Sequence, residues 1–273
     1  MKWTKEAEDA VARVPFFVRK RVRSRIEAEA AIHGSREITI EHVGICQKRY
    51  LNNMEEEVAG FQIETCFGPS GCPNRVVDDE GIAVQVENLL KKKNLRNFFK
   101  LKVKGPLKIH HEFKVSISDC PNACSRPQIA DIGLIGACRP SVTNDPCSGC
   151  RACVEACRED AIELTAGPVM DYGKCLSCGN CCKVCPSGTL VQGRQGWRIM
   201  IGGKLGRHPR LGSELEGIFS SEEALVLFEK CIDIYTAHTV EGERFGEVID
   251  SIGMKMFTAL DLSQGRNELS DIT

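Results

Sequence analysis

The sequence predicts an α+β protein made of an N-terminal helical segment, a mixed α/β body and a cysteine-rich insertion. Apolar residues recur at helical spacing through residues 1–50. Short stretches typical of β-strands flank a helical pattern within residues 58–140. Nine of the 16 cysteines gather in residues 141–190, a density too high for regular core packing.

The helical segment contains three predicted helices. The first covers residues 7–14 and is interrupted by Pro15, and the second covers residues 16–32 with Gly34 as its C-cap. The third covers residues 39–50, where the threonine at its start is a suitable N-cap.

The body has shorter elements. Strands are predicted at residues 61–66, 109–118 and 196–201, and a helix at about residues 80–92. The run Ser-Ser-Glu-Glu at residues 220–223 is a capping box, which predicts that a helix begins there.

Composition and charge argue against some classes of protein. The chain has 36 Lys and Arg against 37 Asp and Glu, and a net charge of −1 argues against a nucleic-acid partner. Its first residues are charged, and no apolar run approaches the ~18 residues of a membrane span. We therefore expect a cytoplasmic protein without a membrane span, in which clustered cysteines bind metal more often than they form disulfides.

Eight cysteines form two runs with one spacing. The runs are Cys147-x2-Cys150-x2-Cys153-x3-Cys157 and Cys175-x2-Cys178-x2-Cys181-x3-Cys185. This is the spacing of bacterial ferredoxins that carry two 4Fe–4S clusters, in which the fourth cysteine of each run binds the other cluster. Residues 141–190 thus resemble such a ferredoxin. The expected ligands are Cys147, Cys150, Cys153 and Cys185 for cluster one, and Cys175, Cys178, Cys181 and Cys157 for cluster two.

Zinc and disulfides are the alternatives for this segment. Zinc sites pair two Cys-x2-Cys units and do not require a third and fourth cysteine, twice over. Cys182 is an additional thiol beside Cys181, so the ligand at that point could be shifted by one residue.

A second set of cysteines has a different spacing. It consists of Cys66-x5-Cys72 and Cys120-x3-Cys124, each within a turn rich in Gly, Pro and Asn. Two such turns can enclose one cluster. The set, together with the stretches at residues 113–136 and 202–210, resembles the siroheme–4Fe–4S site of sulfite and nitrite reductases over residues 58–260. The inserted ferredoxin is similar to the dissimilatory and anaerobic members of that family.

The resemblance implies specific roles. The set at Cys66, Cys72, Cys120 and Cys124 would hold a third 4Fe–4S cluster, and Cys124 would also be the axial ligand of siroheme. Siroheme carries many carboxylates, which arginine binds well. The expected cofactor-binding cations are Arg75, Arg126, Lys204, Arg207 and Arg210, and Lys104 and Lys114 are candidates for binding the substrate anion.

The predicted domains follow from these segments. Residues 1–52 resemble a helical domain of light-independent protochlorophyllide reductase, through residues such as Trp3 and the Val14–Arg19 stretch. Residues 58–140 and 191–262 form a discontinuous reductase-like half-domain, and residues 141–190 form the inserted ferredoxin domain.

The resemblance implies an oxidoreductase. Electrons would enter the ferredoxin clusters, pass to the third cluster and reach siroheme through Cys124, to reduce a small oxyanion such as sulfite or nitrite. Catalytic members of the family usually have two tandem halves and this chain has one. A homo-oligomer or a partner is therefore expected to supply the other half, and an electron donor protein or reductase subunit is a further expected partner.

Two other functions stay open. The half-length architecture is compatible with a non-catalytic, multi-cluster electron-transfer protein that serves a partner oxidoreductase. The N-terminal segment leaves open a protein that handles a tetrapyrrole as its substrate.

Overall fold

The computed structural model describes residues 1–32, 34–77 and 81–258. They belong to two compact units: one contains residues 1–59 and 103–110, and the other residues 60–102 and those from 111 onward. Residues 33, 78–80 and 259–273, among them the end of the predicted 191–262 segment, lie outside the described residues.

The first unit contains the three predicted helices. In chain order its main elements are β1 (Lys2–Trp3), α1 (Lys5–Ala12), α2 (Phe16–Ile32), β2 (Glu37–Ile38) and α3 (Ile40–Glu56). The helices pack through a core of Ala7, Val11, Ile26, Ala30 and Ile38, and β1 pairs with β2 in parallel. The predicted break between the first two helices is confirmed, because Pro15 separates α1 from α2.

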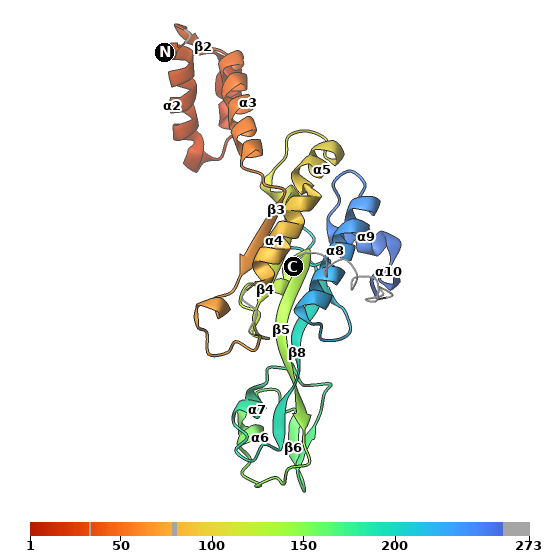
Figure 1. Ribbon diagram of the computed structural model, residues 1–273. Helices are drawn as coiled ribbons and strands as arrows, with labels where there is room; N and C mark the ends of the chain where they lie inside the picture. The colour runs from red at the N-terminus through yellow and green to blue at the C-terminus, as the bar shows by residue number, and fades with distance from the viewer. Residues whose placement is uncertain (33, 78–80, 259–273) are drawn as a thin grey trace. The chain divides into compact units, whose positions relative to one another are not determined.

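The second unit is built on a five-stranded mixed sheet (Figure 1). Its strands are, in spatial order, β3 (Phe61–Thr65), β4 (Phe113–Ser118), β5 (Ile132–Val142), β8 (Leu190–Ile201) and β9 (Ser213–Glu214). The first three are parallel, and β8 is antiparallel to both of its neighbours. The predicted strand at residues 109–118 begins only at Phe113, because Ile109–His111 form a 3-10 turn.

The helices of the second unit include two pairs. These are α4 (Ile82–Lys93) with α5 (Leu95–Lys102), and α8 (Ser221–His238) with α9 (Phe245–Ile252), followed by α10 (Lys255–Thr258). Asn94, in the left-handed conformation with φ of 46°, ends α4, so the short α5 that the sequence pattern did not predict follows directly. The predicted capping box at the start of α8 is confirmed, with both of its hydrogen bonds formed.

Aromatic side chains make the core of this unit. The Tyr235 ring lies 5.1 Å from the ring centroid of Phe113 on β4 and 5.6 Å from that of Phe245 on α9. These three side chains are at most 1% exposed, so they join α8 and α9 to the sheet.

The cysteine-rich insertion connects the far ends of β5 and β8. The two strands pair as far as Val142 and Leu190, and the chain between them forms only short elements (Figure 1). These are α6 (Ala152–Ala156), β6 (Ile162–Leu164), β7 (Pro168–Met170) and α7 (Asn180–Lys183). Their small core includes Cys153 and Cys181, as expected where cysteine ligands replace a larger apolar core. Among the described helices, none has the length and apolar character needed to cross a lipid bilayer.

Candidate iron–sulfur site

Two parallel strands bring the second set of cysteines to one edge of the sheet. Thr65 at the end of β3 pairs with Ile117 near the end of β4. Cys66 and Cys120 follow closely after these strands, so they emerge at the same edge. The Cys66 amide continues the ladder by donating to the Ile117 carbonyl at 3.0 Å.

Asp119 organises the loop that carries Cys66. Its amide donates to Cys66 Sγ at 3.3 Å, and the amide of Gly68 donates to the same sulfur at 3.2 Å. The Asp119 carbonyl accepts from the Val76 amide at 3.0 Å, while its carboxylate forms an ion pair with Arg75 at 3.2 Å. Two amides directed at one sulfur fix the position of the Cys66 thiol at the edge of the sheet.

Glycine is required beside this ligand. A Cβ atom on Gly68 would lie 2.2 Å from Asp119 Oδ2, so a larger residue would displace the aspartate. Gly68 begins the 3-10 turn Gly68–Ser70, and the amide of Cys72 donates to its carbonyl at 3.3 Å. The turn therefore brings Cys72 back toward Cys66.

The other two cysteines of the set lie in a tight turn after β4. The amide of Ala123 donates to the Cys120 carbonyl at 3.1 Å, and Ala123 has a φ of 52°. Cys120 is 7% exposed, whereas Cys124 is exposed at the surface. Cys124 is thus the ligand that a second group could approach.

Three serines hold the turn against β4. Ser125 Oγ donates to the Ile117 carbonyl at 2.7 Å, and its amide donates to Ser118 Oγ at 3.2 Å. Ser116 Oγ donates in turn to the Ser125 carbonyl at 2.6 Å. Because all three serines are buried, these bonds hold the position of Cys124 without competition from water.

The four thiols are close enough to influence one another. Burial raises the pKa of the Cys120 thiol, the amide of Asn122 opposes this, and the charges of Cys124, Cys66 and Cys72 raise the pKa further. Among the described residues, no three His, Cys, Asp or Glu side chains surround a point suited to a single metal ion. Four thiols from two turns at one edge of a sheet are a donor set that fits a 4Fe–4S cluster, in which each thiolate would bind a different iron.

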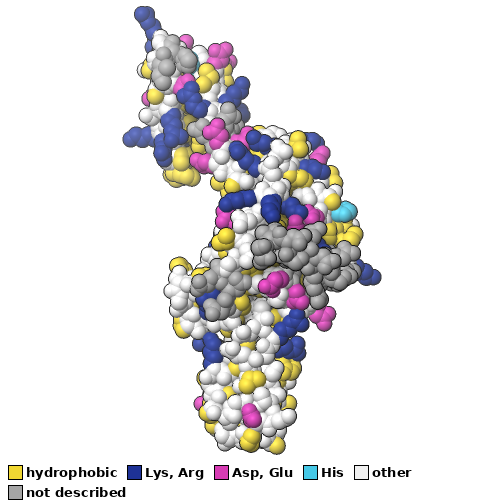
Figure 2. Space-filling view, viewed as in Figure 1, with side chains coloured by type: hydrophobic (Ala, Val, Ile, Leu, Met, Phe, Trp, Pro, Cys, Tyr) yellow, Lys and Arg dark blue, Asp and Glu magenta, His cyan; other side chains and the backbone are white. Residues whose placement is uncertain are grey.

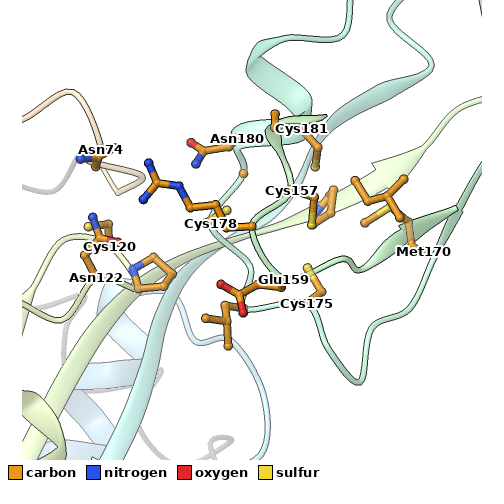
Figure 3. A pocket seen from close by; sticks show the side chains of 17 residues that line it. Asn74, Cys120, Asn122, Cys157, Glu159, Met170, Cys175, Cys178, Asn180 and Cys181 are labelled. Atoms are coloured by element: carbon orange, nitrogen blue, oxygen red, sulfur yellow. The ribbon is translucent and has the colours of Figure 1, made fainter. Parts of the chain in front are cut away.

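A pocket in the insertion is lined by four more cysteines (Figure 3). They are Cys157, Cys175, Cys178 and Cys181, the set expected for ferredoxin cluster two. Residues 120–122 of the turn after β4 line the same pocket. The second ferredoxin site and the Cys66–Cys124 site therefore share a wall.

The thiols of the insertion influence one another, and the exchange of the fourth cysteine between the two runs stays a prediction. Burial raises the pKa of the Cys175 thiol, and the nearby thiolates of Cys181, Cys178 and Cys157 raise it further, although the amide of Ser177 lowers it.

Cys153 of the first run also lies near thiols of the second run. Burial raises the pKa of the Cys153 thiol, the amide of Val154 lowers it, and the charges of Cys185 and Cys181 raise it further. Cys147 Sγ accepts from the amide of Gly149 at 3.4 Å, the same local bond that Cys175 Sγ makes with the amide two residues on.

The two adjacent thiols of α7 have different surroundings. Cys181 is buried and lines the pocket, whereas Cys182 Sγ donates to the Val191 carbonyl at 3.0 Å on β8. Cys182 and the buried Cys138 are additional thiols near the second ferredoxin site.

Two cations of residues 202–210, the glycine-rich loop, already have carboxylate partners. Lys204 Nζ lies 2.6 Å from a carboxylate oxygen of Glu247, and Arg210 forms a 2.6 Å ion pair with Asp250. Both acids belong to α9, so these cations hold the loop against that helix. Either could bind siroheme only by sharing or exchanging its carboxylate partner.

The same loop packs against the chain that follows Cys124. The amide of Gly212 donates to the Gln128 carbonyl at 2.7 Å, and a Cβ atom on Gly203 would lie 2.4 Å from that carbonyl oxygen. Arg207 is exposed near the tip of this loop, and Arg126 is 66% exposed and pairs with Glu64 at 3.3 Å. An exposed thiol with exposed arginines nearby is a donor set that fits a carboxylate-rich haem.

The remaining predicted cations have different positions. Lys114 lies on β4, two and four residues before Ser116 and Ser118, so it shares their face of the sheet. Lys104 belongs to the 103–110 stretch of the first unit, and its role stays a prediction. Sequence reasoning assigned no role to Asp119 or Ser125, although both stand immediately beside a cysteine ligand.

Known proteins match most of the chain. Residues 61–261 match the family described as nitrite and sulphite reductase 4Fe-4S domain, and residues 3–45 match proto-chlorophyllide reductase 57 kD subunit. Coenzyme F420-dependent sulfite reductase of Methanocaldococcus jannaschii is 31% identical over 195 residues, covering 70% of this chain and 29% of the relative. A subunit of the anaerobic sulfite reductase of Salmonella typhimurium is 31% identical over 151 residues, covering 50% of this chain and 40% of the relative.

A solved structure agrees in fold. The crystal structure of dissimilatory sulfite reductase I superposes with a TM-score of 0.52 at 18% identity, over 81% of this chain and 59% of the other. The chain spans less than half the length of the two curated relatives. Because the family match covers residues 61–261 and includes both cysteine sets, the chain belongs to the nitrite and sulphite reductase 4Fe-4S domain family.

Proposed function

We propose that the chain is the iron–sulfur and siroheme-binding part of an oxidoreductase that reduces sulfite or nitrite. The observation that carries the proposal is the wall shared by two cysteine sites: residues 120–122 border the pocket lined by Cys157, Cys175, Cys178 and Cys181. Electron transfer needs redox groups that lie close together, and this arrangement supports a path from the insertion to the sheet edge.

The proposed cofactors are three 4Fe–4S clusters and siroheme. When bound, they supply the electron transfer and the position at which the oxyanion is reduced. The chain's own contribution is to hold the Cys66 sulfur in position through two amides and to hold the turn of Cys124 through buried serines. Arg126 and Arg207 would bind siroheme carboxylates, and Lys114 would attract the anion.

A partner is part of the proposal. The matched region is 40% of the Salmonella relative and 29% of the F420-dependent enzyme, so the complete catalyst is expected to include a further chain or a second copy. That partner would supply the other half of the siroheme site, and a separate donor protein would supply electrons to the insertion.

The test is anaerobic purification followed by metal analysis and spectroscopy. About 12 iron atoms per chain are expected for three clusters and about 13 with siroheme, together with siroheme absorption bands. Sulfite or nitrite reduction is then measured with an artificial electron donor, with and without the partner. Full cluster occupancy without siroheme bands, in the presence of siroheme during production, would rule the catalytic proposal out.

A non-catalytic electron carrier is the second candidate. It needs only the cysteine sites and the wall that they share, and no siroheme. In that case the same preparation would contain about 12 iron atoms, and would pass electrons to a partner oxidoreductase without reducing either anion itself.

A further inference from the structure

Lys183 connects the cysteine-rich insertion with the loop of a different cluster site. It is the last residue of α7, two residues after Cys181, and its Nζ donates to the carbonyls of Pro73 and Arg75 at 3.3 and 3.4 Å. Pro73 directly follows Cys72. The Lys183 side chain therefore connects a residue near Cys181, in the second ferredoxin site, with the residue that follows Cys72, in the Cys66–Cys124 site.

A second cation, Arg198 on β8, holds the loop between Cys175 and Cys178 against the sheet. Arg198 Nη1 donates to the Leu176 carbonyl at 3.4 Å. The guanidinium is held in place by Glu214 of β9, through contacts of 2.5 and 2.6 Å. Because both of its other nitrogens are bound to the carboxylate, Nη1 is directed at the cysteine loop.

A backbone hydrogen bond shows that the loop between Cys175 and Cys178 packs against β5. The amide of Cys138 on β5 donates to the Ser177 carbonyl at 2.6 Å. A Cβ atom on Gly179 would lie 3.1 Å from Cys138 Cβ, so the loop approaches the strand closely. On the face seen in Figure 2, the insertion carries few charged side chains, and Lys and Arg side chains gather where it meets the rest of the unit.

We propose that Lys183 and Arg198 are positioning residues that fix the second ferredoxin site against the Cys66–Cys124 site. The insertion is otherwise attached through β5 and β8, and its loops are bonded to β5 through the Cys138 amide and through the Tyr172 hydroxyl, which donates to the Pro140 carbonyl at 3.1 Å. The two cations bind carbonyl groups on either side of the pocket that residues 120–122 share with Cys175 and Cys178. Their role is to keep the separation of the two sites constant. This inference rests on the proposed function only in requiring clusters at both sites.

The experiment compares Lys183→Met, Arg198→Met and the double variant in the anaerobically purified full chain. Iron content is measured first, and about 12 atoms per chain establish that the cluster premise holds. Hydrogen exchange at the Cys138 amide is then measured, because that amide is protected while Ser177 is docked. We expect exchange about fivefold faster in each single variant, the effect of losing about one hydrogen bond.

The second measurement is electron paramagnetic resonance after reduction by dithionite. Two reduced clusters held at a constant short distance broaden each other's signals, and this magnetic interaction should weaken in the double variant. Lys183→Arg should restore both the interaction and the slow exchange, because its guanidinium can bind the same carbonyls.

Two matched controls exclude a general effect of lost charge. Lys174→Met removes an exposed cation of the insertion that pairs with Asp171, and Arg194→Met removes a cation of the same strand that pairs with Glu223. Neither should change the exchange or the magnetic interaction. Unchanged exchange and unchanged spectra in the double variant at full iron content would overturn the proposal, whereas low iron content in the wild-type chain would count against the proposed function instead.

Discussion

The amide of Asp119 donates a hydrogen bond to Cys66 Sγ over 3.3 Å, although 53 positions separate the two residues in the chain. The contact exists because β3 and β4 are parallel neighbours that end together. It joins the two cysteine turns of the site, since Asp119 directly precedes Cys120. The cluster site therefore depends on the sheet register as well as on its four thiols.

Asp119→Asn should destabilise the site while the Asp119 amide bond to Cys66 is kept. The carboxylate is 7% exposed and pairs with Arg75, whose side chain is 17% exposed, so the change leaves a mostly buried guanidinium charge. Breaking such a pair is costly, and we expect the apparent melting temperature to fall by roughly 5–10 °C. Differential scanning calorimetry under anaerobic conditions measures this. Glu64→Gln breaks the exposed pair with Arg126 and should change the apparent melting temperature by less than about 3 °C.

Gly68→Ala should remove one cluster and leave the others. The added Cβ would lie 2.2 Å from Asp119 Oδ2, which displaces the residue whose amide binds Cys66. We expect a loss of about four iron atoms per chain, measured by iron and acid-labile sulfide assays. Gly167→Ala is the matched control, because a Cβ atom there meets no atom within 4 Å. Equal iron content in both variants would contradict the assignment.

The adjacent cysteines of α7 should behave differently. Cys181→Ser should lower the iron content by about four atoms, whereas Cys182→Ser should retain all of them, because only Cys181 lines the pocket. The reverse result would mean that the ligand is shifted by one residue.

Ser125→Ala should loosen the turn that carries Cys124. The change removes the 2.7 Å bond to the Ile117 carbonyl and the side-chain contact with Ser118 at 2.6 Å, at a cost of about 1–3 kcal/mol. We expect the siroheme absorption bands to weaken more than the iron content falls. Ser251→Ala, which also removes a serine-to-carbonyl bond at 2.8 Å, should leave both unchanged.

Acid should release the glycine-rich loop from α9. Burial by itself would raise the pKa of Glu247, but the Lys204 ammonium and the Arg244 amide hold the pKa below its usual range. A carboxylate with a lowered pKa stabilises the folded protein above its unfolded-state pKa, and this contribution disappears as pH falls through the folded-state value.

The melting temperature of Glu247→Gln, compared with that of the wild-type chain over a range of pH, tests this pH dependence. The variant should melt at a lower temperature than the wild-type chain at neutral pH, and the difference should shrink below about pH 4. Because the Glu247 side chain is 44% exposed, the effect is expected to stay under about 1 kcal/mol. A difference that grows in acid would contradict the assigned pairing.

Much of the candidate site could be predicted from local patterns. The x2 and x3 spacings predict ferredoxin ligands because neighbouring thiolates would have to reach irons of one small cluster from one loop. The helices of residues 1–56 were also predictable, since their apolar period and Pro15 act locally. The short α5 was missed because it follows α4 after only one residue, Asn94, in the left-handed conformation.

By itself, the sequence determined the cysteine runs, the capping box of α8 and the family, since each depends on residue types at short spacing. Only the tertiary structure decided which partners the cations have, that Cys181 rather than Cys182 lines the pocket, and that Asp119 and Lys183 connect distant cysteine loops. The physical reason is that these contacts join residues up to 110 positions apart. The Asp119 contact forms only after the parallel strands β3 and β4 have brought their ends to one edge of the sheet, and no local periodicity encodes such long-range contacts.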